Sequence, residues 1–207
     1  MTSVFQMFKI GVGPSSSHTL GPWRAARRWI SELRADNLLD RVRAFRVELY
    51  GSLALTGLGH GTDRAIVMGL SDTDPETVPL AEMEATISRV TLHGGIARSA
   101  SAGAASPPTA PAPARLIRFH PRDDLVLLRG RRLPGHPNGM AFGAFLSSGE
   151  ERWDIFYSLG GGFIASAAEL AESGDPRTAP RPELEALPGA YPFHDAADLA
   201  QGCEQAG

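Results

Sequence analysis

The sequence of 207 residues has little cysteine and no long apolar run, and each shortage excludes a class of protein. Its single cysteine, Cys203, cannot form an internal disulfide and cannot alone hold a zinc ion or an iron–sulfur cluster. No apolar segment approaches the roughly 20 residues that a membrane-spanning helix needs. The stretch from Met1 to Lys9 lacks a basic region followed by an apolar one, so we expect no secretory signal. These shortages favour a cytoplasmic, globular chain.

Lysine is also scarce, since Lys9 is the only one and arginine supplies the remaining positive charge. Lysine and arginine together number 20 against 23 acidic residues, which gives a net charge of −3. This balance argues against nucleic acid and against an anionic membrane as the main partner. The length suits one generous domain or two small ones and is sufficient to bury a core.

Hydrophobic periodicity predicts helices early in the chain and strands later. Helical spacing is found over residues 22–34, 62–68 and 81–93, and strand-like patterns over 45–49, 114–119, 125–129, 140–146 and 153–157. Residues 3–10 suit a short helix or strand, residues 51–57 continue or bend the first strand, and a last helix begins near Asp195. Residues 98–114 are rich in alanine and proline and predict a mobile loop. The pattern indicates an α+β fold with mixed helices and a mostly antiparallel sheet.

The most polar segment is Ser15-Ser16-Ser17-His18-Thr19, which directly precedes the first clear helix. Hydroxyl groups together with the free N–H groups of a helix start would bind an anion, especially a carboxylate. The alternative is an ordinary capping loop, in which Ser17 or Thr19 satisfies helix amides. No Gly-Lys-Ser/Thr sequence follows, so the segment is not a phosphate-binding Walker loop.

A histidine lies between glycines in Gly57-Leu58-Gly59-His60-Gly61-Thr62-Asp63, where a helix is expected to start. The positive end of that helix would disfavour a second proton on His60 and so favour the neutral imidazole of a general base. Asp63 would orient the ring or cap the helix. A structural histidine in a tight turn is the alternative.

Two further segments offer polar groups beside turns. His136-Pro137-Asn138-Gly139 has the sequence of a β-turn and predicts a plain hairpin turn, or else places His136 and Asn138 against a polar ligand. The glycines at 160–162, with Gly161 central, suit a strand end or a nest of amides near an anion. We assign no role to His93, His120 or His194, and expect Cys203 to be a small buried side chain.

Taken together, these segments resemble the N-terminal β region of the bacterial iron–sulfur L-serine dehydratases. The matching stretches are 3–5, 10–19, 21–22, 50–57, 59–63, 138–140 and 157–163, whereas 71–132 and the region after Ala165 are only loosely similar. The serine-rich motif combined with Gly-His-Gly-Thr-Asp makes the resemblance specific. A lysine common in the family before Gly59-His60 is Leu58 here, which puts any role of that lysine in doubt.

The resemblance implies a domain of an L-serine ammonia-lyase, which converts L-serine to pyruvate and ammonia in the cytoplasm. It implies a [4Fe-4S] cluster held by cysteines of a C-terminal catalytic domain that this chain lacks, so that 1–207 is a β domain without metal ligands, inactive alone. It further implies a homodimer and a fold similar to the allosteric substrate-binding domain of phosphoglycerate dehydrogenase.

On this resemblance the active site is composite, and this chain contributes the catalytic and substrate-binding residues. His60 would be the base, oriented by Asp63 or Thr62. The substrate-binding residues would be Ser15, Ser16, Ser17, His18, Thr19, His136, Asn138 and Gly161. The alternative is a non-catalytic module that binds L-serine as an effector and mediates dimerisation.

Overall fold

The computed structural model describes residues 11–98 and 115–172. Several predictions fall outside these ranges: the helix or strand at 3–10, the loop at 99–114, the helix near Asp195, and the surroundings of His194 and Cys203. Arg98, the first residue predicted for that loop, ends a strand instead. In the described part of the chain, no helix is long and apolar enough to cross a membrane.

A seven-stranded sheet runs through the molecule with the order β2-β3-β1-β5-β6-β7, and β4 also pairs with β1. The strands are β1 (Val42–Tyr50), β2 (Gly95–Arg98), β3 (Arg115–Arg118), β4 (Leu125–Leu128), β5 (Gly139–Leu146), β6 (Glu151–Gly160) and β7 (Phe163–Ser166). Among the described strands, four of the six pairings are antiparallel, and β3 and β4 run parallel to β1. The predicted α+β class with a mostly antiparallel sheet is confirmed.

Strands β3 and β4 lie one after the other along the same edge of β1. Arg118 of β3 pairs near the start of β1, at Ala44, while Leu125–Leu128 of β4 pairs with Val47–Tyr50 at its end. The buried carboxylate of Asp124 closes the bend between them by accepting from the backbone N–H of His120 at 2.8 Å. This arrangement brings the end of β4 next to the end of β1.

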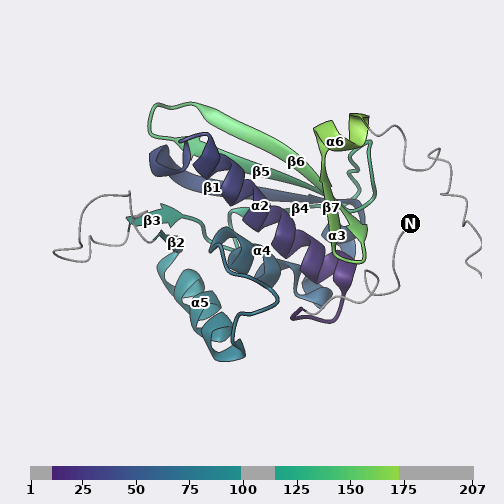
Figure 1. The fold of residues 1–207 in the computed structure, drawn as a ribbon, viewed down its shortest axis with the longest axis horizontal. Coiled ribbons are helices and arrows are strands. Elements are labelled where there is room, and N and C mark those ends of the chain that lie inside the picture. The colour runs from purple at the N-terminus through teal and green to yellow at the C-terminus, as the bar shows by residue number, and fades with distance from the viewer. Residues whose placement is uncertain (1–10, 99–114, 173–207) are drawn as a thin grey trace, which may run out of the picture.

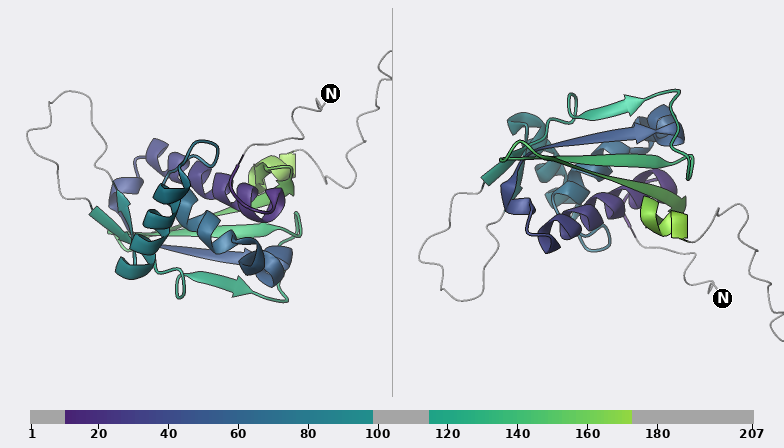
Figure 2. Two further views of the ribbon diagram at one scale, coloured as in Figure 1. Left: turned by 90° about the horizontal axis from the view of Figure 1, so that it is seen from below. Right: turned by 90° about the horizontal axis from the view of Figure 1, so that it is seen from above.

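The helices cover one face of the sheet (Figures 1 and 2). They are η1 (Ser16–Leu20), α2 (Gly21–Ala35), η2 (Leu39–Arg41), α3 (Gly51–Thr56), η3 (Gly57–His60), α4 (Thr62–Leu70), α5 (Leu80–His93) and α6 (Ala167–Glu172). Helix α2 lies across the sheet with α4 beside it and α5 beyond α4, so the helical layer and the sheet enclose one main core.

An aromatic cluster fills the centre of that core. The Trp29 ring, fully buried on α2, stacks on Phe142 of β5 at a centroid distance of 5.3 Å and meets the edge of Phe45 at 5.2 Å. Its indole N–H donates to Asp154 Oδ2 at 2.9 Å, so the one polar atom of the ring has a partner. Apolar residues at helical spacing on α2 and at alternating positions on β1 thus meet as their periodicity predicts.

The arginines opposite that apolar face of α2 form ion pairs with neighbouring elements. Arg27 and Arg34 bind the acidic segment after α4, and Arg24 binds Glu76, while Arg28 donates through two nitrogens to Glu169 of α6. These side chains are partly exposed, as a solvated face should be. The pair of Arg28 with Glu169 also holds α6 against α2.

Three local predictions are wrong. Residues 51–56 form helix α3 rather than a continuation of β1, and residues 16–20 form a π-helical turn rather than a loop. His136–Gly139 is not a hairpin turn, because β4 and β5 lie on opposite sides of β1 and the chain between them must pass from one side to the other. Strand β2 and helix α6, with four and six residues, are too short for a periodicity to predict them.

Candidate active site

The predicted site residues come together at one end of the sheet. Strands β1, β4 and β6 end there, β5 begins there, and the N-terminus of α2 lies over them. Figure 1 shows this end at the right of the view, where α3 and the β6–β7 hairpin meet the start of α2. Turns η1 and η3 pack against each other at this end.

The serine-rich segment is a helical turn whose hydroxyls are held to different degrees. Ser15 caps η1, since its Oγ accepts from the backbone N–H of His18 at 3.2 Å. Its Oγ also lies 3.5 Å from Ser17 Oγ. Ser16 is exposed, so its hydroxyl faces solvent. The cap is therefore Ser15, not Ser17 or Thr19 as the capping alternative predicted, and Ser16 remains available to a ligand.

The His18 ring has a hydroxyl partner at each nitrogen. Ser17 Oγ lies 2.9 Å from Nδ1, and Ser52 Oγ of α3 lies 3.0 Å from Nε2. Burial lowers the pKa of His18, the nearby His60 ring lowers that pKa further, and a hydrogen bond with Ser52 acts in the opposite direction. The ring is thus favoured in its neutral form at pH 7.

His60 lies beside His18, with ring centroids 5.0 Å apart and the planes inclined by 43°. Its Nδ1 is 2.9 Å from the backbone carbonyl oxygen of Thr56, one turn earlier in the chain. A carbonyl oxygen only accepts, so Nδ1 must carry the hydrogen of this bond. In the neutral ring, Nε2 is then left with a lone pair, which is what a general base requires.

The orientation of His60 differs from the prediction that named Asp63 or Thr62 as its partner. Asp63 lies in the first turn of α4 and, within the described residues, makes no hydrogen bond to His60. The buried Thr62 hydroxyl donates to the backbone carbonyl of His18 instead. The partner is the Thr56 carbonyl because η3 returns the ring over the end of α3.

Thr19 and Thr62 join the two histidine-bearing turns. The hydroxyl of Thr19, buried at 5% exposure, donates to the backbone carbonyl of His60 at 2.7 Å, and Thr62 makes the reciprocal bond to His18. Their hydroxyl hydrogens are therefore committed to backbone carbonyls. The structure gives both residues a bracing role, which holds η1 against η3.

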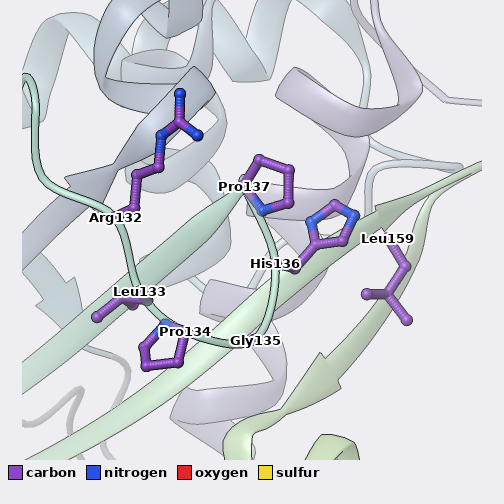
Figure 3. Close-up of a pocket in the computed structure, with 7 residues that line it drawn as sticks. All are labelled: Arg132, Leu133, Pro134, Gly135, His136, Pro137 and Leu159. Carbon is purple, nitrogen blue, oxygen red and sulfur yellow. The ribbon is translucent and has the colours of Figure 1, made fainter. Parts of the chain in front are cut away.

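His136 lies in the loop between β4 and β5, at a cavity of about 550 Å³. The cavity is lined by Arg132, Leu133, Pro134, Gly135, His136, Pro137 and Leu159. Figure 3 shows the His136 ring between the side chains of Pro137 and Leu159. The backbone N–H of Asn138 donates to its Nδ1 at 3.2 Å, which leaves the hydrogen of the neutral ring on Nε2. Burial lowers the pKa of His136.

Asn138 is connected to the rest of the site by hydrogen bonds through Ser158, a residue that the sequence did not predict to be part of it. Its side-chain amide donates to the backbone carbonyl of Ser158 at 3.2 Å, and the fully buried Ser158 hydroxyl donates to the Ser17 carbonyl at 2.7 Å. Ser52 was missed as well. Both serines lie in apolar strand-like segments, and only their distant partners show what they do.

The glycine turn at 160–162 lies against the start of α2. All three glycines have positive φ angles, and the Gly162 carbonyl accepts from Arg24 Nη1 at 3.1 Å. A side chain at 162 would meet Leu20 at 2.8 Å, whereas one at Gly161 would meet only Phe163. Gly161 therefore borders the site through its backbone, at the tip of the β6–β7 turn.

Among residues 11–98 and 115–172, no three histidine, cysteine, aspartate or glutamate side chains gather closely enough to hold a metal ion. Thiolates are the usual ligands of an iron–sulfur cluster, and the sequence has only Cys203, outside those residues. The residues described here therefore do not fit a [4Fe-4S] cluster.

Comparison with known proteins gives a consistent result. The chain is 39% identical over its whole length to the L-serine dehydratase TdcG of Escherichia coli, and covers 41% of that protein. It is 42% identical over 163 residues to an L-serine dehydratase of Streptomyces coelicolor, which takes in 78% of this chain and 33% of the relative. An L-serine dehydratase of Mycobacterium tuberculosis is 42% identical over 173 residues, covering 83% of the chain and 34% of the relative.

The chain thus spans about two fifths or less of the length of these relatives. Residues 3–169 match the family described as the serine dehydratase beta chain, and this range includes each site residue discussed above. The sequence resemblance, the α+β fold and this match agree: the chain belongs to the serine dehydratase beta chain family.

Proposed function

We propose that this chain is the β domain of an L-serine ammonia-lyase and contributes the proton-abstracting base to its active site. The observation that carries the proposal is the hydrogen bond from His60 Nδ1 to the Thr56 carbonyl, which leaves Nε2 as the basic atom. Family membership supports the reaction class, and the L-serine dehydratases among the relatives support L-serine as the substrate.

In this proposal His60 Nε2 takes the α-proton of L-serine. Loss of the substrate hydroxyl as hydroxide then gives an aminoacrylate, and the protonated His60 returns its proton to make water. The aminoacrylate hydrolyses to pyruvate and ammonia. The ring centroids of His18 and His60 are 5.0 Å apart. Because burial lowers the pKa of His18, this ring stays neutral and places no second positive charge beside the protonated His60. Two adjacent imidazolium rings would repel each other and weaken the base.

The substrate carboxylate and amino group would bind at η1. Ser16 presents an exposed hydroxyl, and Ser15 and Ser17 present oxygens that retain bonding capacity on the same turn. Asn138 would border this turn, because its amide is linked to Ser17 through Ser158. Asp63 lies three residues after His60, in the first turn of α4, and would contact the bound substrate.

The [4Fe-4S] cluster belongs to the part of the enzyme beyond this chain in our proposal. The relatives are more than twice as long as the segment that matches, which leaves room for a domain with cysteine ligands. The site is then composite, the β domain alone is inactive, and the complete protein is a cytoplasmic homodimer.

Turnover of L-serine by the complete dehydratase tests the role of His60. His60→Ala should lower kcat by about 100-fold or more, because a general base contributes at least that factor. His93→Ala, at the exposed end of α5, is the matched control and should leave kcat unchanged. A His60→Ala enzyme within about tenfold of the parent would contradict the proposal. L-Serine deuterated at Cα should show a primary isotope effect if proton abstraction limits the rate.

A second candidate function, an effector site for L-serine, is favoured by the cavity at 132–137. Its wall combines a guanidinium at Arg132 and the Nε2–H of His136 with apolar side chains, a combination suited to a small amino acid (Figure 3). The chain would then bind L-serine by itself and act as a regulatory and dimerisation module.

Titration of the 207-residue chain with L-serine, with D-serine as the control, distinguishes the two functions. Saturable, L-selective changes in the His136 imidazole signals would support the effector site. Changes confined to the His18 and His60 signals would place L-serine at η1 instead. No change in a folded chain would favour a composite site that needs the rest of the enzyme.

A further inference from the structure

The His18 ring is oriented by two hydroxyl groups, which can bond to it in any of its protonation states. Ser17 Oγ at 2.9 Å and Ser52 Oγ at 3.0 Å contact the two ring nitrogens. A hydroxyl rotates to donate or accept, so either neutral tautomer and the protonated ring all keep both hydrogen bonds. The position of His18 is therefore only as well defined as the positions of these two serines.

Ser52 is fixed by its backbone. Its N–H donates to the Pro137 carbonyl at 3.0 Å, at the first turn of α3. This approach requires glycine at the preceding position, because Gly51 has a φ of +54° and a Cβ there would lie 2.1 Å from the Pro137 oxygen. The loop that carries His136 and Asn138 thus sets where the Ser52 hydroxyl lies.

Ser17 is fixed through an unusual feature of η1. In this π-helical turn the N–H of Gly21 donates to the Ser16 carbonyl, five residues earlier. The same pattern would pair residue 22 with the Ser17 carbonyl, but Pro22 has no N–H. The Ser158 hydroxyl supplies the missing donor at 2.7 Å.

The position of Ser158 is in turn tightly specified. Its side chain is fully buried, and a Cβ at Gly21 would lie 2.0 Å from its Oγ, so only glycine admits it. Its backbone N–H donates to the Asn138 carbonyl at 3.0 Å, and its own carbonyl accepts from the Asn138 amide. Both braces of His18 therefore start from adjacent residues, Pro137 and Asn138.

We propose that Ser52 and Ser158 are positioning residues for His18, and that together they hold its ring in register with His60. Ser52 acts on Nε2 directly, and Ser158 acts on Nδ1 through Ser17. The proposal rests on the proposed function for its catalytic consequence, but the positioning itself is a property of this chain. A displaced His18 would disturb the geometry of the pair and lower kcat in the complete enzyme.

The imidazole ¹⁵N signals of the 207-residue chain test the positioning without reference to activity. Ser52→Ala should shift the His18 Nε2 signal, and Ser158→Ala should shift its Nδ1 signal, while His93 on α5 stays unchanged as an internal reference. Ser52→Thr keeps the hydroxyl and should return the Nε2 signal to the parent position. Backbone amide spectra establish that each variant is folded.

Ser71→Ala is the matched control, because it also removes a hydroxyl that donates to a backbone carbonyl, that of Val67 at 2.8 Å, at the end of α4. His18 signals that move no further in Ser52→Ala and Ser158→Ala than in Ser71→Ala would overturn the proposal. If Ser158→Ala does not fold, the pair Ser52→Ala and Ser52→Thr still decides it, since failure of Thr to restore the signal contradicts positioning by the hydroxyl.

Turnover by the complete enzyme separates this proposal from the proposed function. Ser52→Ala should lower kcat by about 10- to 100-fold, the scale expected for a misplaced catalytic group, and Ser52→Thr should recover most of it. Shifted His18 signals with unchanged turnover would refute the catalytic role of His18 while leaving the positioning intact. Unchanged signals would refute the positioning even if His60→Ala abolishes turnover.

Discussion

Replacing Gly51 by alanine should destabilise the protein through the contact that also places Ser52. A non-glycine residue at a φ of +54° costs about 1–2 kcal/mol. The added Cβ would lie 2.1 Å from the Pro137 oxygen, so the loop must move and the hydrogen bond from the Ser52 N–H is lost, at about 0.5–1.5 kcal/mol. We expect Gly51→Ala to lower the free energy of unfolding by about 1.5–3.5 kcal/mol.

Urea unfolding followed by far-ultraviolet circular dichroism measures this change. Gly59→Ala is the matched control, because a Cβ at Gly59 meets no atom within 4 Å and its φ is not in the positive range. That substitution should be neutral or stabilise by about 0.4–1 kcal/mol, through a smaller entropy of the unfolded chain. A Gly51→Ala protein as stable as Gly59→Ala would show that α3 and the loop at 131–138 are not in this close contact.

Two further predictions concern surfaces away from the site. Hydrogen bonds from Arg28 and from the Ser166 backbone hold the pKa of Glu169 at about 2, so this group adds stability above its unfolded pKa of about 4.5 and loses it as the pH falls toward 2. The pair is half exposed and worth no more than about 1 kcal/mol; Glu169→Gln should flatten this part of the acid unfolding profile, and an identical profile would contradict the assignment. Gly143→Ala should displace Trp153, since a Cβ there would lie 2.8 Å from its ring, and shift the indole fluorescence to longer wavelength; an unchanged spectrum would show that the ring does not pack on Gly143.

The parts of the fold that the sequence predicts well are those with long, regular periodicity. Helix α2 has an apolar face that recurs at helical spacing, and β1 alternates through Phe45, Val47 and Leu49, so both are confirmed within a few residues. The short helix α3 escaped prediction because its six residues follow directly on β1, and its start depends on the positive φ of Gly51.

The candidate site was predicted only as separate segments. The sequence selects His18, His60 and Asn138 from local composition and family resemblance, but the pairing of β4 and β5 with opposite edges of β1 is not visible in any local pattern. The hydroxyls of Ser52 and Ser158 form hydrogen bonds with residues 34 and 141 positions away in the sequence, so no local pattern marks them as part of the site. The hydrogen bond between His60 and the Thr56 carbonyl depends on the course of the backbone, which no local sequence pattern shows.

The position of the hydrogen on the neutral His60 ring decides whether Nε2 can act as the base. Two-dimensional ¹H–¹⁵N spectra of the imidazoles, recorded at a mildly alkaline pH where histidines are neutral, report which nitrogen carries the hydrogen. We predict a hydrogen on Nδ1, bound to the Thr56 carbonyl, and a free lone pair on Nε2. A neutral His60 ring with its hydrogen on Nε2 would contradict this prediction, because the atom assigned as the base could not then accept the α-proton of L-serine.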